Sequence, residues 1–273
     1  MGAAIRIKDV RKSYYAIRDG AEVEALGGIT LDVPNGEFLS IVGPSGCGKS
    51  TLLFIVAGLV APTEGTVDFG EEPVSGPSWQ RGMAFQDFAL FPWLTVSENI
   101  EFGPKMRGIQ REERRQAVGK YLEIVGLKAF ADKYPHELSG GMKQRTALAR
   151  TLANGPDVLL MDEPFASVDA QTRQLLQYEL LRIWSTGETK RTVVFVTHSV
   201  EEALYLSDRV LVMTARPGRI LEDIAVPFER PRGEHLLKDP RFTDLRIEIW
   251  SHIKREVLGQ NSDELRSGVE ERC

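Results

Sequence analysis

The stretch Gly43–Thr51, which reads Gly-Pro-Ser-Gly-Cys-Gly-Lys-Ser-Thr, constrains the fold of this chain more than any other. It matches the pattern Gly-x-x-x-x-Gly-Lys-Ser/Thr at Gly43, Gly48, Lys49 and Ser50. Glycines allow the backbone to curl so that successive N–H groups point inward and surround an anion. Lys49 would then place its charge on the terminal phosphates of a nucleotide, and the Ser50 hydroxyl would ligate Mg²⁺. We expect nucleotide contacts along the whole stretch: Gly43, Pro44, Ser45, Gly46, Cys47, Gly48, Lys49, Ser50 and Thr51.

The residues on either side of this stretch favour the same interpretation. The apolar run 37–42 predicts a buried strand, and the run 51–57 predicts a packed helix that stops at Gly58. A glycine-rich turn between a strand and a helix aims the positive end of the helix dipole at phosphate. The sequence therefore predicts a nucleoside-triphosphate site rather than an unrelated turn.

Composition narrows the class of protein. The 273 residues are 42% hydrophobic and 27% charged, as expected for a globular chain with one substantial core and room for a smaller satellite domain. The net charge of −5 gives no general attraction to nucleic acid. The most apolar run, 52–61, is far shorter than the ~20 residues of a membrane-spanning helix, and the first residues lack the apolar region of a signal peptide. We therefore expect any membrane association to come through a partner.

The two cysteines, Cys47 and Cys273, make no disulfide framework and fit a reducing compartment. Neither they nor the four scattered histidines have the spacing of a zinc site. Lys49 and the helix N-terminus could lower the pKa of the Cys47 thiol and make it sensitive to oxidation. We favour the simpler interpretation, in which Cys47 is a small residue at a variable position.

Patterning predicts the remaining elements. Strands are expected at 5–10, 29–33, 65–69, 82–85, 157–162, 192–197, 209–214 and 219–226, and helical segments at 96–125, 140–152, 167–184 and 242–258, with 259–273 frayed. The aromatic segment 88–94 is by default core or a domain seam, and a partner-docking patch is the sharper alternative. Tyr14 and Tyr15 could stack on a nucleotide base or simply pack at a strand edge.

The strand 157–162 ends in two acids, Asp162 and Glu163. Carboxylates at the C-terminal ends of strands lie where ligands bind in open α/β sheets. The first acid would hold Mg²⁺, usually through its waters, and Glu163 could orient and deprotonate an attacking water. A solvated pair of strand-end acids is a weak alternative because the strand and the phosphate loop occur together.

Other signals are weak when each is taken alone. Ser139 followed by Gly140 and Gly141 predicts a capped helix start that could accept an anion, but an ordinary capped helix explains it as well. His198, at the end of a strand, is more often structural than catalytic.

These motifs together resemble the ATP-binding cassette (ABC) family, specifically the ATPase subunits of bacterial importers. The resemblance covers 5–226 and rests on the order of the motifs: Gly43–Thr51, Gln86, Leu138–Gln144, Leu159–Glu163, Asp169 and His198. The Leu-Ser-Gly-Gly-Met-Lys-Gln stretch is the most diagnostic of them. The implied fold is α/β, a P-loop NTPase (RecA-like) core with an N-terminal antiparallel β subdomain and an inserted α-helical signature subdomain at about 95–155. The nucleotide-binding domain would span 1–227, followed by a short tail, 228–273, with one helix.

The resemblance also implies a role for each motif. Tyr14 would stack on the adenine of ATP, although the adjacent Tyr15 leaves the register open. Gln86 would contact Mg²⁺ and the attacking water, and would sense the membrane partner. Glu163 would be the general base, and His198 would hold the γ-phosphate. The residues expected to act across a subunit boundary are Ser139, Gly140, Gly141 and Asp169, the last in a Ser167-Val-Asp stretch where the family usually has Ala-Leu-Asp.

In this family the signature helix cannot reach the nucleotide of its own subunit, so the resemblance implies two chains paired head to tail. The second cassette would be an identical chain or a related ATPase. Further partners would be transmembrane permease subunits and a solute-binding protein, with the chain on the cytoplasmic face of the bacterial inner membrane.

Several segments resemble the nitrate, sulfonate and taurine branch, among them 88–93, 161–166, 169–173, 216–219 and 230–232. In that branch 88–93 would help to receive a cytoplasmic helix of the permease. A different small organic solute is an alternative, and a soluble cassette ATPase acting on ribosomes or DNA is a weaker one. Neither a second cassette nor a long coiled-coil insertion is present, and we expect no nucleic-acid partner.

Overall fold

A computed structural model of the chain describes residues 5–15, 20–166, 168–185 and 191–270. Its larger sheet has six strands in the order β10-β9-β3-β8-β7-β6, all parallel except the edge strand β10. Their bounds are β3 (Phe38–Val42), β6 (Arg81–Ala84), β7 (Val158–Asp162), β8 (Thr192–Val196), β9 (Arg209–Met213) and β10 (Ile220–Ala225). The strands β3, β7 and β8 are buried along their whole length, which explains why they are continuous apolar runs in the sequence.

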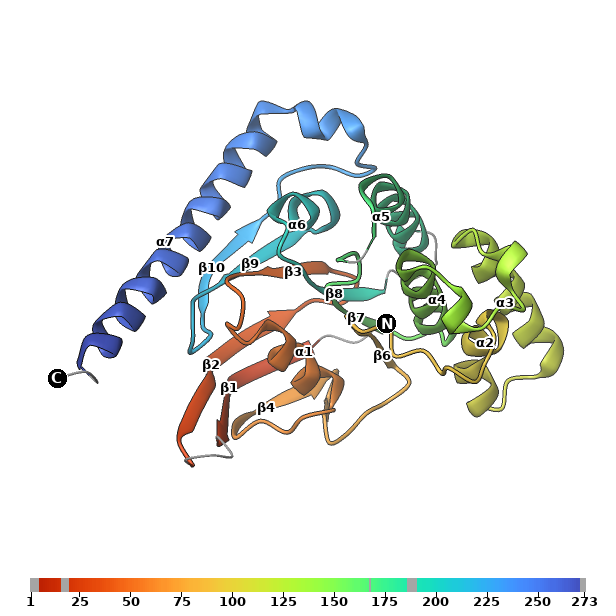
Figure 1. Cartoon of the computed structure of the whole chain (residues 1–273), viewed down its shortest axis with the longest axis horizontal. Helices are drawn as coiled ribbons and strands as arrows, with labels where there is room; N and C mark the ends of the chain where they lie inside the picture. The colour runs from red at the N-terminus through yellow and green to blue at the C-terminus, as the bar shows by residue number, and fades with distance from the viewer. Residues whose placement is uncertain (1–4, 16–19, 167, 186–190, 271–273) are drawn as a thin grey trace.

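A smaller antiparallel sheet has the order β2-β1-β4-β5 and lies across helix α1 from the larger one (Figure 1). Its strands are β1 (Ile5–Tyr15), β2 (Glu22–Val33), β4 (Glu64–Phe69) and the short β5 (Glu72–Pro73). Helix α1 (Lys49–Ala57) buries apolar side chains against both sheets, so one core fixes the phosphate loop at its N-terminus.

Two of the predicted strands were too short. β1 and β2 pair from Ile5 opposite Val33 to Tyr15 opposite Glu22, well beyond the predicted 5–10 and 29–33. Register shifts interrupt this pairing at several points along β1. Each irregularity disturbs the alternation of apolar and polar residues, so the outer halves of both strands lose the strand pattern.

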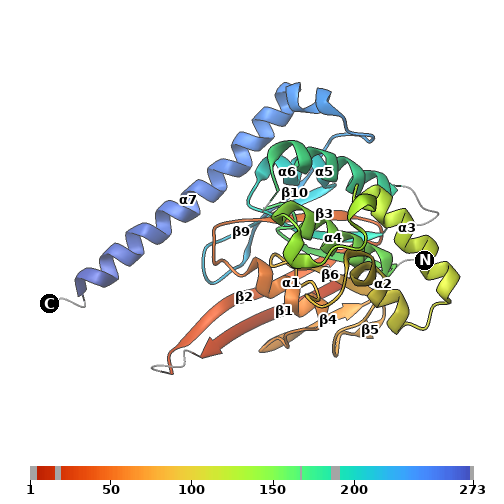
Figure 2. The same ribbon diagram turned by 45° about the vertical axis from the view of Figure 1, so that its right-hand side comes forward.

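Helices α2 (Val96–Met106), α3 (Arg111–Ile124) and α4 (Gly140–Ala153) pack together at one end of the larger sheet (Figure 2). The single helical segment predicted at 96–125 is therefore two helices, separated at Gly108, whose φ is 72°. Thr95 and Glu98 form a reciprocal capping box at the start of α2. Short 3₁₀ helices at Lys128–Phe130 and Pro135–Glu137 lead into α4.

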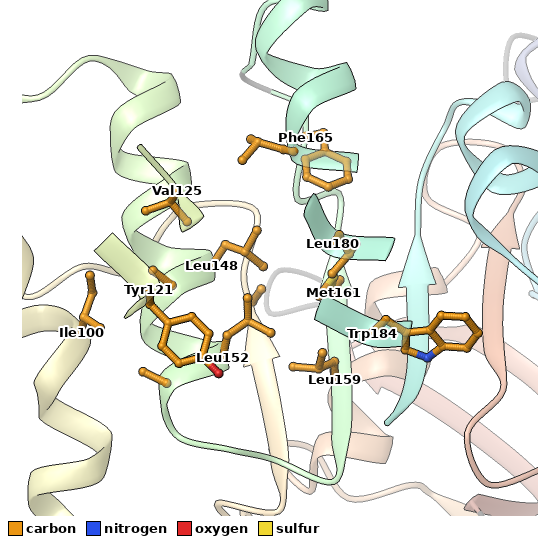
Figure 3. Close-up of a cluster of buried hydrophobic side chains, with 14 of the residues drawn as sticks. Ile100, Tyr121, Val125, Leu148, Leu152, Leu159, Met161, Phe165, Leu180 and Trp184 are labelled. Carbon is orange, nitrogen blue, oxygen red and sulfur yellow. The ribbon is translucent and has the colours of Figure 1, made fainter. Parts of the chain in front are cut away.

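Helix α4 connects this helical group to the larger sheet. Its Leu148 and Leu152 lie between Tyr121 of α3 on one side and Leu159 of β7 on the other (Figure 3). All of these side chains belong to one buried cluster. The start of α4 is thereby held in a fixed position relative to the strand that ends in Asp162.

The C-terminal part of the chain comprises α5 (Ala170–Ser185), α6 (Val200–Leu206), a 3₁₀ helix (Glu234–Lys238) and α7 (Pro240–Glu270). The prediction of a frayed end from residue 259 was wrong as far as Glu270, and 271–273 lie outside the described residues. Phe242, Ile249 and Ile253 anchor the first half of α7 in the core, and the helix then extends away from the body (Figure 1). None of the helices in the described ranges is both long enough and apolar enough to cross a membrane.

Candidate nucleotide site

The phosphate loop joins β3 to α1, as the sequence predicts. Gly48 caps the helix with a φ of 98°, and a Cβ on this residue would lie 2.7 Å from Leu26 Cδ2 and 2.8 Å from the Ala25 carbonyl oxygen. Only glycine fits this turn without displacing β2. Lys49 is 5% exposed, and its Nζ donates hydrogen bonds to the carbonyl oxygens of Gly43 (2.9 Å) and Pro44 (2.7 Å). The ammonium group is thus held inside the curl of the loop.

Ser50 and Asp162 come together across the sheet. The Ser50 hydroxyl donates to Asp162 Oδ1 at 3.0 Å. Burial raises the pKa of Asp162; the Ser50 hydrogen bond opposes this shift, and the charge of neighbouring Glu163 adds to it. A hydroxyl and a buried carboxylate are the oxygen ligands that Mg²⁺ prefers, so the residues present fit this ion beside a bound triphosphate.

Glu163 lies between His198 and Gln86. His198 Nε2 lies 2.6 Å from Glu163 Oε1, and Gln86 Nε2 donates to Glu163 Oε2 at 3.4 Å. The register of β7 and β8 pairs Asp162 with Val196, which explains how residues 35 positions apart come into contact. The Glu163 backbone has a φ of 48°, unusual for a residue with a side chain, and its N–H donates to the Val196 carbonyl oxygen. The carboxylate is therefore aimed by both its backbone and its neighbours.

Lys49, Ser50, Gln86, Glu163 and His198 line one cavity of about 590 Å³, which also contains Tyr14 but not Tyr15. Asp162 does not line it and is joined to it by the Ser50 hydrogen bond. Tyr14 is 42% exposed, with Lys12 Nζ 5.1 Å from its ring centre, whereas Tyr15 is 70% exposed. The cavity also contains Arg216, for which the sequence predicts no role. Arg216 Nη2 donates to the Gly46 carbonyl oxygen at 3.3 Å. The Arg-Pro-Gly turn is recognisable in the sequence, but no pattern in the neighbouring residues indicates that it packs against the phosphate loop.

Eight predicted site residues do not line the cavity. Gly43, Pro44, Cys47 and Asp162 lie directly beside its lining residues, and four others lie elsewhere. The cavity, as lined by described residues, does not include Ser139, Gly140, Gly141 or Asp169. Ser139 is exposed at the start of α4, where its Oγ accepts a hydrogen bond from the Met142 N–H. Asp169 is exposed at the start of α5, and the hydrogen bond from the Thr172 N–H lowers its pKa. Ser167 lies outside the described residues.

Cys47 is fully buried. Burial raises the pKa of its thiol, and the charge of Lys49 only partly opposes this shift. The thiol is therefore not activated, in agreement with the simpler interpretation of this residue.

A phosphate loop with a strand-end Asp-Glu pair and a polar His-Gln pair beside it defines a P-loop NTPase. Residues 26–166 match the model of the family described as ABC transporter. The chain is 53% identical over 240 residues to an uncharacterized ABC transporter ATP-binding protein of Methanocaldococcus jannaschii, covering 88% of each chain. This chain belongs to the ABC transporter family.

Other relatives carry more specific names. Taurine import ATP-binding proteins TauB are similar: that of Ruegeria pomeroyi is 49% identical, covering 90% of this chain and 94% of the relative, and that of Jannaschia sp. is 45% identical, covering 95% and 97%. A solved dimeric, post-hydrolysis structure of the ATP-binding cassette MJ0796 with ADP and Pi has a TM-score of 0.73 and 32% identity, covering 82% of this chain and all of the other. The resemblance to importer ATPase subunits, the expected fold class and the expected ATPase class are thereby confirmed.

Proposed function

We propose that this chain is the ATPase subunit of an importer, which hydrolyses ATP in a head-to-tail dimer to drive solute uptake through a separate membrane permease. The observation that carries the proposal is the convergence of Ser50, Asp162, Glu163 and His198 at the phosphate loop. The relatives named for taurine import support a small anion as the solute, such as taurine, another sulfonate or nitrate.

The polar groups of the site have distinct roles in the proposed reaction. The N–H groups of Gly46–Lys49 and the Lys49 ammonium bind the phosphates of ATP. Glu163 accepts a proton from the attacking water, and Gln86 orients that water. The contact between His198 and Glu163 occupies the carboxylate that must accept this proton. His198 therefore has to move from Glu163 to the γ-phosphate before hydrolysis.

Ser50, Asp162 and Gln86 would hold Mg²⁺. When bound there, the ion would supply positive charge against the negative charge that develops on the phosphate oxygens. Burial raises the pKa of Asp162, and a neighbouring cation would favour the ionised form of this carboxylate.

The exposed start of α4 supports the head-to-tail arrangement. We propose that α2–α4 form the signature subdomain, in which Ser139, Gly140 and Gly141 bind the γ-phosphate held by the partner subunit. Ser139 caps α4 and leaves its N-terminus exposed at the surface, and Asp169 is exposed as well. The two dimeric structures of the similar cassette MJ0796 are in keeping with this arrangement.

A groove of about 510 Å³ between β6, α2 and α4 is the proposed docking site for a cytoplasmic helix of the permease. Phe91 and Met106 line this groove, and Trp93, beside Phe91, is 70% exposed. Arg150 holds the segment in place by donating to the Phe88 and Ala89 carbonyl oxygens. Apolar side chains exposed around a groove match an amphipathic helix, and docking here would place the chain on the cytoplasmic face of the inner membrane.

The docking site can be tested with two tryptophans. Trp93→Ala should reduce the permease recovered from gently solubilised membranes by roughly 10-fold, because a large exposed aromatic contributes strongly to an interface. Trp250→Ala removes a similarly exposed tryptophan from α7 and should leave recovery unchanged. The bait would be the full chain carrying Glu163→Gln with ATP, and the readout the membrane proteins in the eluate.

Recovery of a polytopic membrane protein together with a solute-binding protein would support the importer. That binding protein would then be titrated with taurine, other sulfonates and nitrate to identify the solute. Recovery of ribosomes or nucleic acid without a membrane protein would contradict the importer and favour a soluble cassette ATPase.

Tyr14 and Tyr15 give a second matched pair. Tyr14→Ala should weaken ATP binding by roughly 5- to 150-fold, because stacking on a base contributes about 1–3 kcal/mol. Tyr15→Ala should have little effect, since this side chain does not line the cavity. Titration with a fluorescent ATP analogue measures both, and a larger effect at Tyr15 would show that the register is shifted by one residue.

A further inference from the structure

Among the residues that the structure describes, one buried carboxylate has no part in the proposed reaction. Glu202 lies on α6, four residues after His198, and is 9% exposed. Its Oε2 accepts a hydrogen bond from Thr197 Oγ1 at 2.6 Å, and its Oε1 accepts one from Gln177 Nε2 at 3.2 Å. Arg173 Nε lies 3.6 Å from the same Oε1. A carboxylate in such a position requires partners on both oxygens. Here one partner, Thr197, lies in the loop after β8, and the other two, Arg173 and Gln177, lie on α5.

The loop after β8 carries His198. Thr197 is 4% exposed and directly precedes His198 in the chain. Its Oγ1 donates to Glu202 and also accepts a hydrogen bond from the Ser199 N–H at 3.0 Å. Thr197 therefore bonds the Glu202 carboxylate directly and Ser199 is joined to it through the Thr197 hydroxyl. These bonds orient the backbone on both sides of His198.

The loop before α5 carries Asp169. Arg173 lies on α5, and its Nη2 donates to the Val168 carbonyl oxygen at 3.0 Å. Val168 directly precedes Asp169, which the proposed dimer places at the subunit boundary. Helices α5 and α6 lie side by side in Figures 1 and 2, and the Gln177–Glu202 hydrogen bond joins them.

The electrostatic surroundings of Glu202 agree with its position between Thr197 and Arg173. Burial raises the pKa of Glu202, while the Thr197 hydrogen bond, the Arg173 charge and the Gln177 hydrogen bond oppose the shift, and the charge of Glu163 adds to it. Removing the carboxylate charge would leave Arg173 without its acidic partner and free to change its contact with Val168.

We propose that Glu202 is a positioning residue that links the His198 loop of a subunit to the Asp169 loop of the same subunit. This inference rests on the proposed head-to-tail dimer, in which His198 serves the subunit's own ATP and Asp169 faces the ATP of the opposite site. Through the contacts Thr197–Glu202–Arg173–Val168, a change in the nucleotide bound at one site then alters the geometry of the other site. Its expected consequence is cooperativity between the two ATP sites.

The first test compares Glu202→Gln with Glu201→Gln. Glu202→Gln keeps the side-chain volume but loses the charge that holds Arg173. ATP affinity should stay within about 2-fold, because no contact to the phosphate loop is lost. The turnover number should fall by roughly 10- to 100-fold, as expected for a misplaced reacting group, and the Hill coefficient for ATP should approach 1. Glu201 is the exposed neighbour on α6, and Glu201→Gln should match the parent protein in all three quantities.

The second test uses mixed dimers with one inactive site. One subunit carries Glu163→Gln, and Glu202→Gln is placed either in that subunit or in the active one. The surviving site uses His198 of the active subunit and Asp169 of the inactive subunit, so Glu202→Gln should slow it from either position. A purely structural role of Glu202 would lower the melting temperature without slowing the surviving site from the inactive subunit.

Arg173→Gln tests the same link from the other side and keeps the proposal testable if Glu202→Gln folds poorly. The double variant should lose no more activity than the stronger single variant, because both changes break one chain of contacts. Wild-type cooperativity in folded Glu202→Gln and Arg173→Gln would overturn the inference while leaving the ATPase assignment intact. A parent chain that neither dimerises with ATP nor hydrolyses it would overturn both.

Discussion

Glu163→Gln should keep ATP binding and lower the turnover number by about 10²- to 10⁴-fold, the usual contribution of a general base. The amide has nearly the same shape as the carboxylate and preserves contacts to His198 and Gln86, so the cavity should keep its geometry. It cannot accept a proton from water near neutral pH. ATP would then hold the dimer closed because the step that releases it is blocked.

Phosphate release and size-exclusion chromatography measure the two effects. The variant should elute as a dimer with MgATP and as a monomer with MgADP. Asp162→Asn is an informative comparison, because it removes a proposed Mg²⁺ ligand and should weaken MgATP binding as well as turnover. Turnover at the parent rate in Glu163→Gln would remove Glu163 from the role of base.

Lys49→Met should weaken ATP binding by roughly 10- to 100-fold, the value of a lost charge-assisted hydrogen bond. Methionine keeps the aliphatic stem but removes the buried ammonium group that Gly43 and Pro44 hold within the loop. The affinity for ATP should fall more than the affinity for ADP, because the ammonium group is expected to contact the terminal phosphates.

Isothermal titration with ATP and ADP measures this difference. Lys49→Arg retains the charge but places a larger group in a buried position, so it should also bind ATP poorly. Thermal unfolding without nucleotide separates loss of binding from loss of the fold, since removing Nζ leaves two loop carbonyl groups without this donor. A folded Lys49→Met with unchanged ATP affinity would contradict the proposed role.

Much of the site could be predicted from the sequence because its parts are local. The turn at Gly48, the buried strand that ends in Asp162 and the Ser139 cap each depend on a few consecutive residues. Backbone conformation, burial and capping are properties of such short stretches, so their patterns are visible without the fold.

Other parts depend on long-range pairing and were missed or left open. Register shifts hid the outer halves of β1 and β2, and packing of Phe242, Ile249 and Ile253 determined where α7 is anchored. Arg216 gained a place in the nucleotide cavity only because its turn folds against the phosphate loop. The choice between Tyr14 and Tyr15 likewise required the position of β1 beside the cavity.

The sequence by itself determined which chemical groups this protein has and the local conformation in which each is presented. Only the tertiary structure decided which of them meet: Ser50 with Asp162, Glu163 with His198, and Glu202 with Thr197 and Arg173. The physical reason is that these contacts join separate strands and helices. Their geometry follows from the register of the parallel sheet and from the need to pair buried charges, and neither is a property of a short stretch of chain.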